Sequence, residues 1–184
     1  KEKFPDAALH TIHWIEWTTY LLDPQDPLFR KVAKIFMEEQ IKRFGTDNYY
    51  AADTFIEMNP PSGDPEYLQN LSRAIYRGMS ESDPEAVWVL QTWIFLNKQE
   101  FWTQERIKAF LGAVSDDKML CLDLFCEERP QWSRTQSFYG KPWLWCNIQN
   151  FGCTVHMGGA LENTNAGLME VRQAPEKGKL EGLG

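Results

Sequence analysis

Apolar residues along this 184-residue chain follow two spacings, one typical of helices and one typical of buried strands. Over residues 26–45, 64–79 and 103–114 they recur every three or four positions, which predicts three amphipathic helices. Asp64 followed by Pro65 suits the start of the second helix, because an aspartate caps free backbone N–H groups and proline fits the first helical position.

Between and after these helices lie short runs that are apolar almost throughout, over residues 48–55, 85–95, 118–125 and 142–151. Such runs predict strands of a parallel sheet that is buried on both faces. Residues 178–184 have the character of one more strand. Right-handed crossovers then place the carboxyl ends of all these strands at one edge of the sheet.

This alternation predicts an α/β fold, and we expect part of a (β/α)8 TIM-like barrel with parallel strands. A complete barrel needs about 250 residues, whereas this chain supplies four clear strands and the opening of a fifth. An open doubly wound sheet is the alternative, although no glycine-rich phosphate loop supports a nucleotide site in it. Residues 21–184 are expected to form the incomplete barrel domain, and the pattern does not place the N-terminal segment, 1–20.

Composition and charge narrow the classes of partner. The net charge of −7 and the absence of a Lys/Arg block argue against nucleic acid. No apolar run is long enough to span a membrane. The three histidines lack metal-ligand spacing beyond a weak pair at His10 and His13, so we expect no metal and no cofactor. The cysteines form no CxxC pair and are expected to be free thiols, mostly buried: Cys121, Cys126, Cys146 and Cys153.

Glu57 is the first candidate for chemistry, because it follows the run 48–55 and therefore lies near the predicted carboxyl edge of the sheet. Its position alone is more typical of a solvated loop glutamate. The other strands, however, bring further polar and aromatic groups to the same edge, which favours a site there. These groups are Trp93, Asp123 with Leu124, and Asn150 with Phe151.

Several long motifs carry a family likeness. The stretches "AADTFIEMNPPSGDPEYL", "AVWVLQTWIF", "MLCLDLFCE", "RTQSFYGKPWLWCNIQNFG" and "GGALENTNAG" occur in this order, and the chain resembles the catalytic barrel of the α-N-acetylglucosaminidases from about Leu21 to Gly184. Those enzymes remove terminal N-acetylglucosamine from α-linked glycans, including heparan sulfate. The resemblance implies an exo-acting retaining glycosidase whose partner is such a glycan. A homo-oligomer is compatible with the sequence.

The resemblance also implies roles for individual residues. Glu57 matches the general acid/base, and Trp93, Leu124 and Phe151 match positions that line the sugar pocket. A retaining mechanism needs two carboxyl groups about 5–5.5 Å apart, one to protonate the leaving oxygen and one to attack the anomeric carbon. Two polar neighbours are expected to hydrogen-bond sugar hydroxyls, Asp123 and Asn150.

The chain departs from the family pattern at two points. An asparagine is expected just before the acid/base glutamate, but this chain has Ile56, which cannot hydrogen-bond a 2-acetamido group. The family nucleophile is a glutamate shortly after a strand like "KLEGLG", and we expect it a few residues beyond Gly184. Glu176 in "QAPEKG" resembles the nucleophile motif superficially, but it precedes that strand and receives no catalytic role.

Two other interpretations stay open. The missing nucleophile is compatible with a non-catalytic fragment or a glycan-binding barrel piece, and Ile56 leaves room for a glycosidase that cleaves β-linked sugars. The resemblance places the protein in the secretory pathway or lysosome of a eukaryote, or outside the cytoplasm of a bacterium. The net charge of −7 provides no steering toward a polyanionic glycan.

Overall fold

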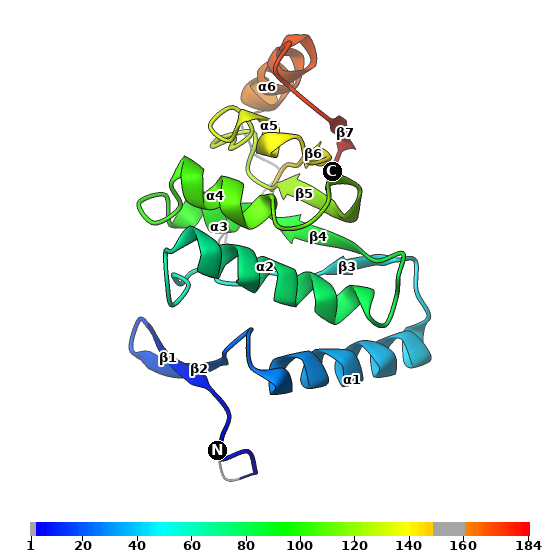
Figure 1. Cartoon of the computed structure of the whole chain (residues 1–184). Helices are drawn as coiled ribbons and strands as arrows, with labels where there is room; N and C mark the ends of the chain where they lie inside the picture. The colour runs from blue at the N-terminus through cyan, green and yellow to red at the C-terminus, as the bar shows by residue number, and fades with distance from the viewer. Residues whose placement is uncertain (1–2, 149–160) are drawn as a thin grey trace.

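A computed structural model describes residues 3–148 and 161–184, which form an antiparallel hairpin followed by a five-stranded parallel sheet (Figure 1). The strands of that sheet are hydrogen-bonded in chain order. Each strand therefore lies next to its successor, as in a barrel, whereas a doubly wound sheet reverses its order at a switch point. The strands are β3 (Tyr49–Ala51), β4 (Val87–Gln91), β5 (Met119–Asp123), β6 (Trp143–Trp145) and β7 (Leu180–Leu183).

The predicted helices are present, with the caps that the sequence indicated. Asp64 accepts a hydrogen bond from the backbone N–H of Glu66 at 3.1 Å, and Pro65 opens the helix. One long helix after the undescribed segment 149–160 was not predicted. The helical segments are α1 (Pro27–Phe44), α2 (Pro65–Ser80), α3 (Trp93–Asn97), α4 (Gln104–Leu111), η1 (Asp116–Lys118), α5 (Gln136–Tyr139) and α6 (Leu161–Gln173).

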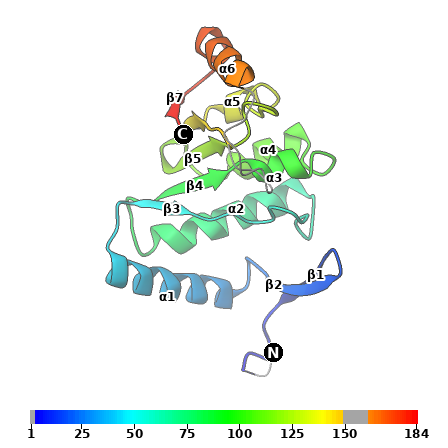
Figure 2. The same cartoon turned by 180° about the vertical axis from the view of Figure 1, so that it is seen from behind.

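Helices α2 and α4 pack on each other and cover one face of the sheet, and in the view from behind β3 lies in front of α2 (Figure 2). Trp88 is fully buried on the covered face; its indole N–H donates to the carbonyl of Ala52 at 2.8 Å, and its ring meets Phe110 edge-on at 5.7 Å. On the opposite face Val89 and Leu122 are only half-buried. The expectation of burial on both faces was therefore wrong for these five strands.

All four strands from β3 to β6 end earlier than the apolar runs predicted, and the contacts of the first two show why. The run 48–55 is a strand only to Ala51, because Phe55 is buried with φ +58°, a left-handed conformation that no strand accommodates. Within the run 85–95, the strand β4 ends at Gln91. Both the N–H and the hydroxyl of Thr92 donate to the carbonyl of Leu122, and the chain then enters α3.

The N-terminal segment forms a hairpin of β1 (Leu9–Trp14) and β2 (Trp17–Leu22), so the expected boundary between residues 20 and 21 falls inside a strand. Three contacts tie the hairpin to the start of α1. The Asp23 N–H donates to the Ala8 carbonyl at 2.8 Å, the Ala8 N–H donates to the Asp26 carboxylate at 2.7 Å, and His10 Nε2 lies 2.5 Å from the Asp23 carboxylate.

Helix α1 packs on α2 at close range. A Cβ on Gly78 would lie 2.8 Å from the Cβ of Ala33, so only glycine permits this approach. The apolar residues of α1 occupy two faces, and α2 covers only one of them. Val32, Ile35 and Phe36, expected on the buried face of an amphipathic helix, are instead 51%, 53% and 65% exposed.

The cysteine prediction is confirmed within the described ranges, where Cys121, Cys126 and Cys146 are buried free thiols. Burial raises the pKa of the Cys146 thiol to about 11. Cys153 lies outside the described residues. No helix in the described part of the chain is both long and apolar enough to cross a membrane.

Trp88→Ala is expected to lower the free energy of unfolding by about 3–5 kcal/mol, because it leaves a large cavity between sheet and helices. Urea unfolding followed by circular dichroism measures this loss. Tyr20→Ala is the control, since Tyr20 is 68% exposed and its removal should cost less than about 1 kcal/mol. Equal losses in the two variants would contradict the assignment of Trp88 to the core.

Candidate active site

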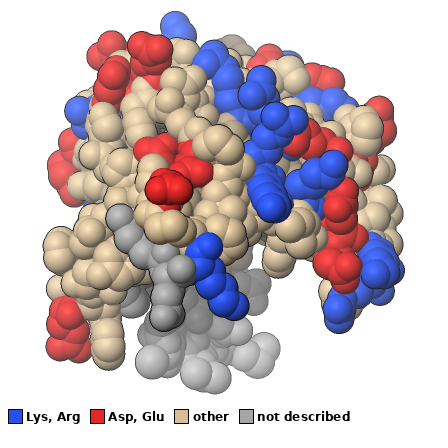
Figure 3. Space-filling model, turned by 60° about the horizontal axis from the view of Figure 1, so that its bottom comes forward, with Lys and Arg blue, Asp and Glu red and all other residues tan. Residues whose placement is uncertain are grey.

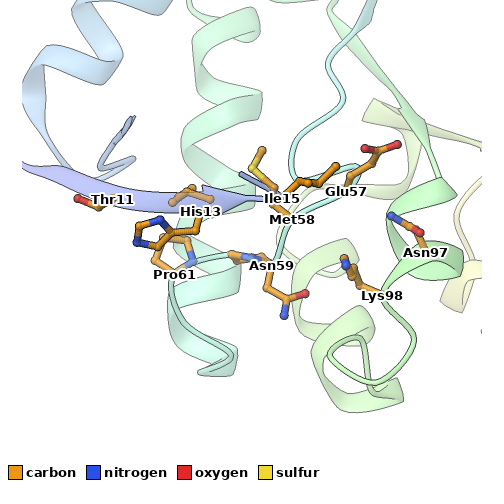
Figure 4. Close-up of a pocket in the computed structure, with 11 residues that line it drawn as sticks. Thr11, His13, Ile15, Glu57, Met58, Asn59, Pro61, Asn97 and Lys98 are labelled. Atoms are coloured by element: carbon orange, nitrogen blue, oxygen red, sulfur yellow. The ribbon is translucent and has the colours of Figure 1, made fainter. Parts of the chain in front are cut away.

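Glu57 lies in the loop that follows β3, where the carboxyl ends of the parallel strands meet. The side chain is exposed and borders a cavity of about 670 Å³ between this loop, the N-terminal hairpin and the end of α3 (Figure 4). In Figure 4 its carboxylate points away from His13 and Pro61, which lie at the other side of the cavity. The lining residues are Thr11, Ile12, His13, Ile15, Glu57, Met58, Asn59, Pro60, Pro61, Asn97 and Lys98.

Two side chains from later helices hold the loop that carries Glu57. The Asn97 amide donates to the carbonyl of Ile56 at 3.0 Å. At the far end of the loop, Arg106 donates to the carbonyl of Gly63 at 2.9 Å, and its guanidinium lies 4.7 Å from the ring centroid of Phe101. A Cβ on Gly63 would lie 2.4 Å from that guanidinium, so a larger residue at this position would displace the Arg106 side chain.

The start of the same loop is anchored to β4. The Asp53 carboxylate accepts a hydrogen bond from the Gln91 N–H at 3.2 Å, and burial raises the Asp53 pKa. Phe55 packs into the core with φ +58°. A buried non-glycine residue in this conformation stores backbone strain, which the surrounding packing must hold. The strain turns the chain out of the strand direction just before Glu57.

The predicted sugar-pocket residues lie at the ends of the next two strands. Trp93 opens α3 directly after β4, and Leu124 follows β5; both are half-buried. The sequence analysis missed Phe125, whose ring centroid lies 6.2 Å from that of Trp93. Neither Trp93 nor Leu124 is among the described residues that line the Glu57 cavity. Asn150 and Phe151 lie outside the described residues.

Asp123 lies beneath this edge of the sheet, with only 1% of its surface exposed. Its carboxylate accepts hydrogen bonds from the backbone N–H groups of Gln131 at 2.8 Å and Trp132 at 2.9 Å, and from the Thr92 hydroxyl at 3.5 Å. Burial raises the Asp123 pKa to about 6. This environment argues against the expected contact with a sugar hydroxyl and indicates that Asp123 holds the loop after β5.

Two further predictions concern Ile56 and Glu176. The Ile56 side chain is partly buried and packs against the hydrophobic core. The carbonyl of Glu176 accepts a hydrogen bond from the Ser137 hydroxyl, in the segment that leads into β7. Glu176 therefore lies near the amino end of that strand, at the opposite edge of the sheet from Glu57.

His13, Asn59, Asn97 and Lys98 are cavity residues that the sequence analysis did not single out. His13 reaches the cavity from a hairpin that the apolar pattern did not predict. Asn97 and Lys98 end α3, a helix whose first three residues fall in the run 85–95 that was predicted as a strand. Within residues 3–148 and 161–184, no three His, Cys, Asp or Glu side chains are grouped closely enough to hold a metal ion.

The cavity supplies one carboxyl group able to give or take a proton, amides able to hydrogen-bond a ligand, and a cation at Lys98. Among its described lining residues Glu57 is the single carboxylate. A second carboxylate for a two-carboxylate reaction must therefore come from elsewhere.

Comparison with known proteins gives a consistent result. A family model described as "Alpha-N-acetylglucosaminidase (NAGLU) tim-barrel domain" matches residues 1–184. Human alpha-N-acetylglucosaminidase is 46% identical over 157 residues, which are 85% of this chain and 21% of the human protein. The chain thus spans about a fifth of the length of this relative.

Solved structures of a family 89 glycoside hydrolase from Clostridium perfringens share the fold. One is a complex with its substrate GlcNAc-α-1,4-galactose, which matches with a TM-score of 0.80 and 26% sequence identity. The match covers 100% of this chain and 20% of the Clostridium perfringens chain. Another, a complex with PUGNAc, has a TM-score of 0.73 and 27% identity over 96% of this chain and 20% of that one.

The raised pKa of Asp123 makes stability fall as the pH rises. Below about pH 4 the Asp123 carboxyl is protonated in both the folded and the unfolded chain. Between about pH 4 and pH 6 it is ionised in the unfolded chain but still protonated in the folded chain. The free energy of unfolding should therefore drop by up to roughly 3 kcal/mol across that interval. Asp123→Asn is expected to flatten the dependence, as measured by urea unfolding from about pH 4 to about pH 7.

Glu105→Gln, on an exposed position of α4, is the control and should leave the pH dependence unchanged. A slope that persists in Asp123→Asn would show that Asp123 does not titrate in this range. Asp53, whose pKa is also raised by burial, contributes in the same direction and remains in both variants.

Arg106 donates to the carbonyl of Gly63 at 2.9 Å and to that of Phe101 at 2.8 Å. Arg106→Gln is expected to loosen the loop that carries Glu57, because glutamine is too short to make both hydrogen bonds. Hydrogen exchange with mass spectrometry should show faster exchange over residues 56–63, by about tenfold or more. Lys108→Gln, an exposed substitution on the same helix, should leave that peptide unchanged. Unaltered hydrogen exchange in Arg106→Gln would contradict the role of Arg106 in ordering this loop.

Proposed function

Because this chain belongs to the α-N-acetylglucosaminidase TIM-barrel family, we propose that it forms the acid/base half of an exo-acting glycosidase site that removes terminal α-linked N-acetylglucosamine. The observation that carries the proposal is Glu57. It is the one carboxylate among the described residues of a cavity at the carboxyl edge of the parallel strands, which is where barrel enzymes place their chemistry.

In the proposed retaining reaction, Glu57 protonates the glycosidic oxygen as the bond to the anomeric carbon breaks. A second carboxylate attacks that carbon from the opposite side, and Glu57 then takes a proton from the water that releases the sugar. Rigid placement matters for this role, because the proton must be delivered within hydrogen-bond distance. The ties from Asn97 and Arg106 supply that placement.

The nucleophile is assigned to no described residue. Strand β7 pairs with β6, and the Gly184 N–H donates to the carbonyl of Trp145 at 2.9 Å. A carboxylate carried just after β7 would therefore emerge at the same edge of the sheet as Glu57. We place the nucleophile there, in agreement with the expected position after "KLEGLG".

The sugar itself is proposed to lie against Trp93, Leu124 and Phe125, whose apolar surfaces follow β4 and β5. Indole faces pack well on the C–H groups of a pyranose ring. Ile56 cannot bind the 2-acetamido group, and the amides of Asn59 and Asn97 in the cavity are proposed to do so instead. Asp123 acts from beneath, as a positioning residue for the loop that carries Leu124.

Glu57→Gln, made in an enzyme that also carries the proposed nucleophile after β7, tests the acid/base assignment. With GlcNAc-α-1,4-galactose, whose leaving group needs protonation, kcat/KM should fall by about 100- to 10,000-fold. With 4-nitrophenyl N-acetyl-α-glucosaminide, whose leaving group departs without an acid, the formation of the glycosyl-enzyme should fall much less. Release of galactose and of nitrophenol measures the two reactions.

Glu66→Gln, an exposed carboxylate in the first turn of α2, is the matched control and should keep full activity. Equal losses with both substrates in Glu57→Gln would contradict an acid/base role. Absence of turnover in well-folded wild-type protein would favour a non-catalytic fragment, and preference for the β-linked aryl glycoside would favour the other class of glycosidase.

A further inference from the structure

A second concave site lies between α1 and α2, away from the Glu57 cavity. It is a groove of about 870 Å³, and none of the residues that line it borders the Glu57 cavity. Five of its lining residues are basic and two are acidic, in a chain whose net charge is −7. The basic residues are Arg30, Lys31, Lys34, Arg73 and Arg77.

The helix spacing explains why these cations face one another. Arg30 and Lys34 are one turn apart on α1, and Arg73 and Arg77 are one turn apart on α2, so each pair lies on a single helix face. The close contact of Gly78 with Ala33 brings the two faces together. Figure 3, in which the lower side of Figure 1 comes forward, shows a cluster of Lys and Arg side chains near the centre of the view, with acidic side chains beside it and further basic side chains elsewhere.

The two carboxylates of the groove are already engaged. Asp26 accepts hydrogen bonds from the N–H groups of Ala8 at 2.7 Å and Leu28 at 2.8 Å, which lower its pKa. Glu81 accepts from Arg30 at 2.7 Å. These contacts account for both negative charges and for only one of the five positive charges.

Lys34 pairs with Glu38 at 3.7 Å on the same helix, and the other three cations lack such compensation. In the described part of the chain, Lys31, Arg73 and Arg77 form no ion pair, and the hydrogen bonds of Arg73 go to the neutral side chains of Asn70 and Gln69. All three basic side chains are exposed. Like charges held in one groove repel each other, and a concave surface focuses their field on whatever enters it. The arrangement suits an anionic ligand.

We propose that this groove is an exosite for an anionic polysaccharide, a linear glycan that carries carboxylate or sulfate groups. Arginine forks pair with both groups in bidentate fashion. Asn70 and Gln25, also in the groove, offer amides for sugar hydroxyls. An active site that contacts only one uncharged terminal sugar gains affinity for the glycan when a second site binds another part of the same glycan. The local charge also explains how an acidic protein would approach a polyanion.

Other polyanions fit the groove less well. Single-stranded nucleic acid binds through aromatic platforms for its bases, whereas the one aromatic lining residue, Phe29, is half-buried. A slender sugar chain can follow the groove along its length.

The test is direct binding to a fluorescein-labelled sulfated glycosaminoglycan octasaccharide, measured by anisotropy at about 0.15 M salt. Combined Lys31→Gln, Arg73→Gln and Arg77→Gln should weaken binding by about tenfold or more. A control with the same change in charge, Lys42→Gln, Arg43→Gln and Arg172→Gln, should weaken it by less than about twofold. Circular dichroism melts of both variants verify that they fold, since all six side chains are exposed.

Absence of binding by the wild-type protein, or equal losses in the two triple variants, would overturn the proposal. Tighter binding of single-stranded DNA or of phosphatidylserine vesicles than of the octasaccharide, with the same sensitivity to the groove substitutions, would assign the groove to another class of partner and overturn it too. The measurement involves no turnover, so its result is independent of whether Glu57 is catalytic.

Discussion

Parallel pairing of β3 to β7 in chain order is the constraint on which the rest of this structure depends. Because each strand runs in the same direction as its neighbour, every connection returns over one face, and every strand ends at the same edge. That single geometric fact brings the loop of Glu57 beside the segments that follow β4 and β5. It also leaves α1 and α2 side by side on the outside, where their basic faces form the groove.

The proposed active site is held by contacts between segments far apart in the chain. Arg106 and Asn97 reach back to the loop after β3, while Asp123 collects backbone N–H groups from the loop after β5. Burial of a carboxylate is unfavourable unless hydrogen-bond donors surround it. For Asp123, two of these donors are backbone N–H groups of the loop after β5. The cost of burying Asp123 is thus coupled to the order of the segment that contains Leu124.

The distribution of charge separates two tasks. The Glu57 cavity has one carboxylate and few cations, which suits an uncharged terminal sugar. The groove between α1 and α2 concentrates positive charge in an otherwise acidic molecule. Net charge describes long-range repulsion between whole molecules, whereas binding responds to the field within about a Debye length, roughly 8 Å at physiological salt. An acidic protein with a basic groove therefore presents no contradiction.

The sequence by itself determined α1, α2 and α4, the approximate strand positions and the barrel-like order, because apolar spacing and caps such as Asp64 report local preferences. The apolar pattern made Glu57 a candidate at the carboxyl edge of the sheet, and the family resemblance predicted its acid/base role. Only the tertiary structure decided where the strands end, that Asp123 is buried, and that a hairpin brings His13 to the cavity. Those features depend on contacts between segments that are far apart in the chain. Such contacts decide which side chains are buried, where the backbone is strained and which groups hydrogen-bond, and the spacing of residues along the chain does not reveal them.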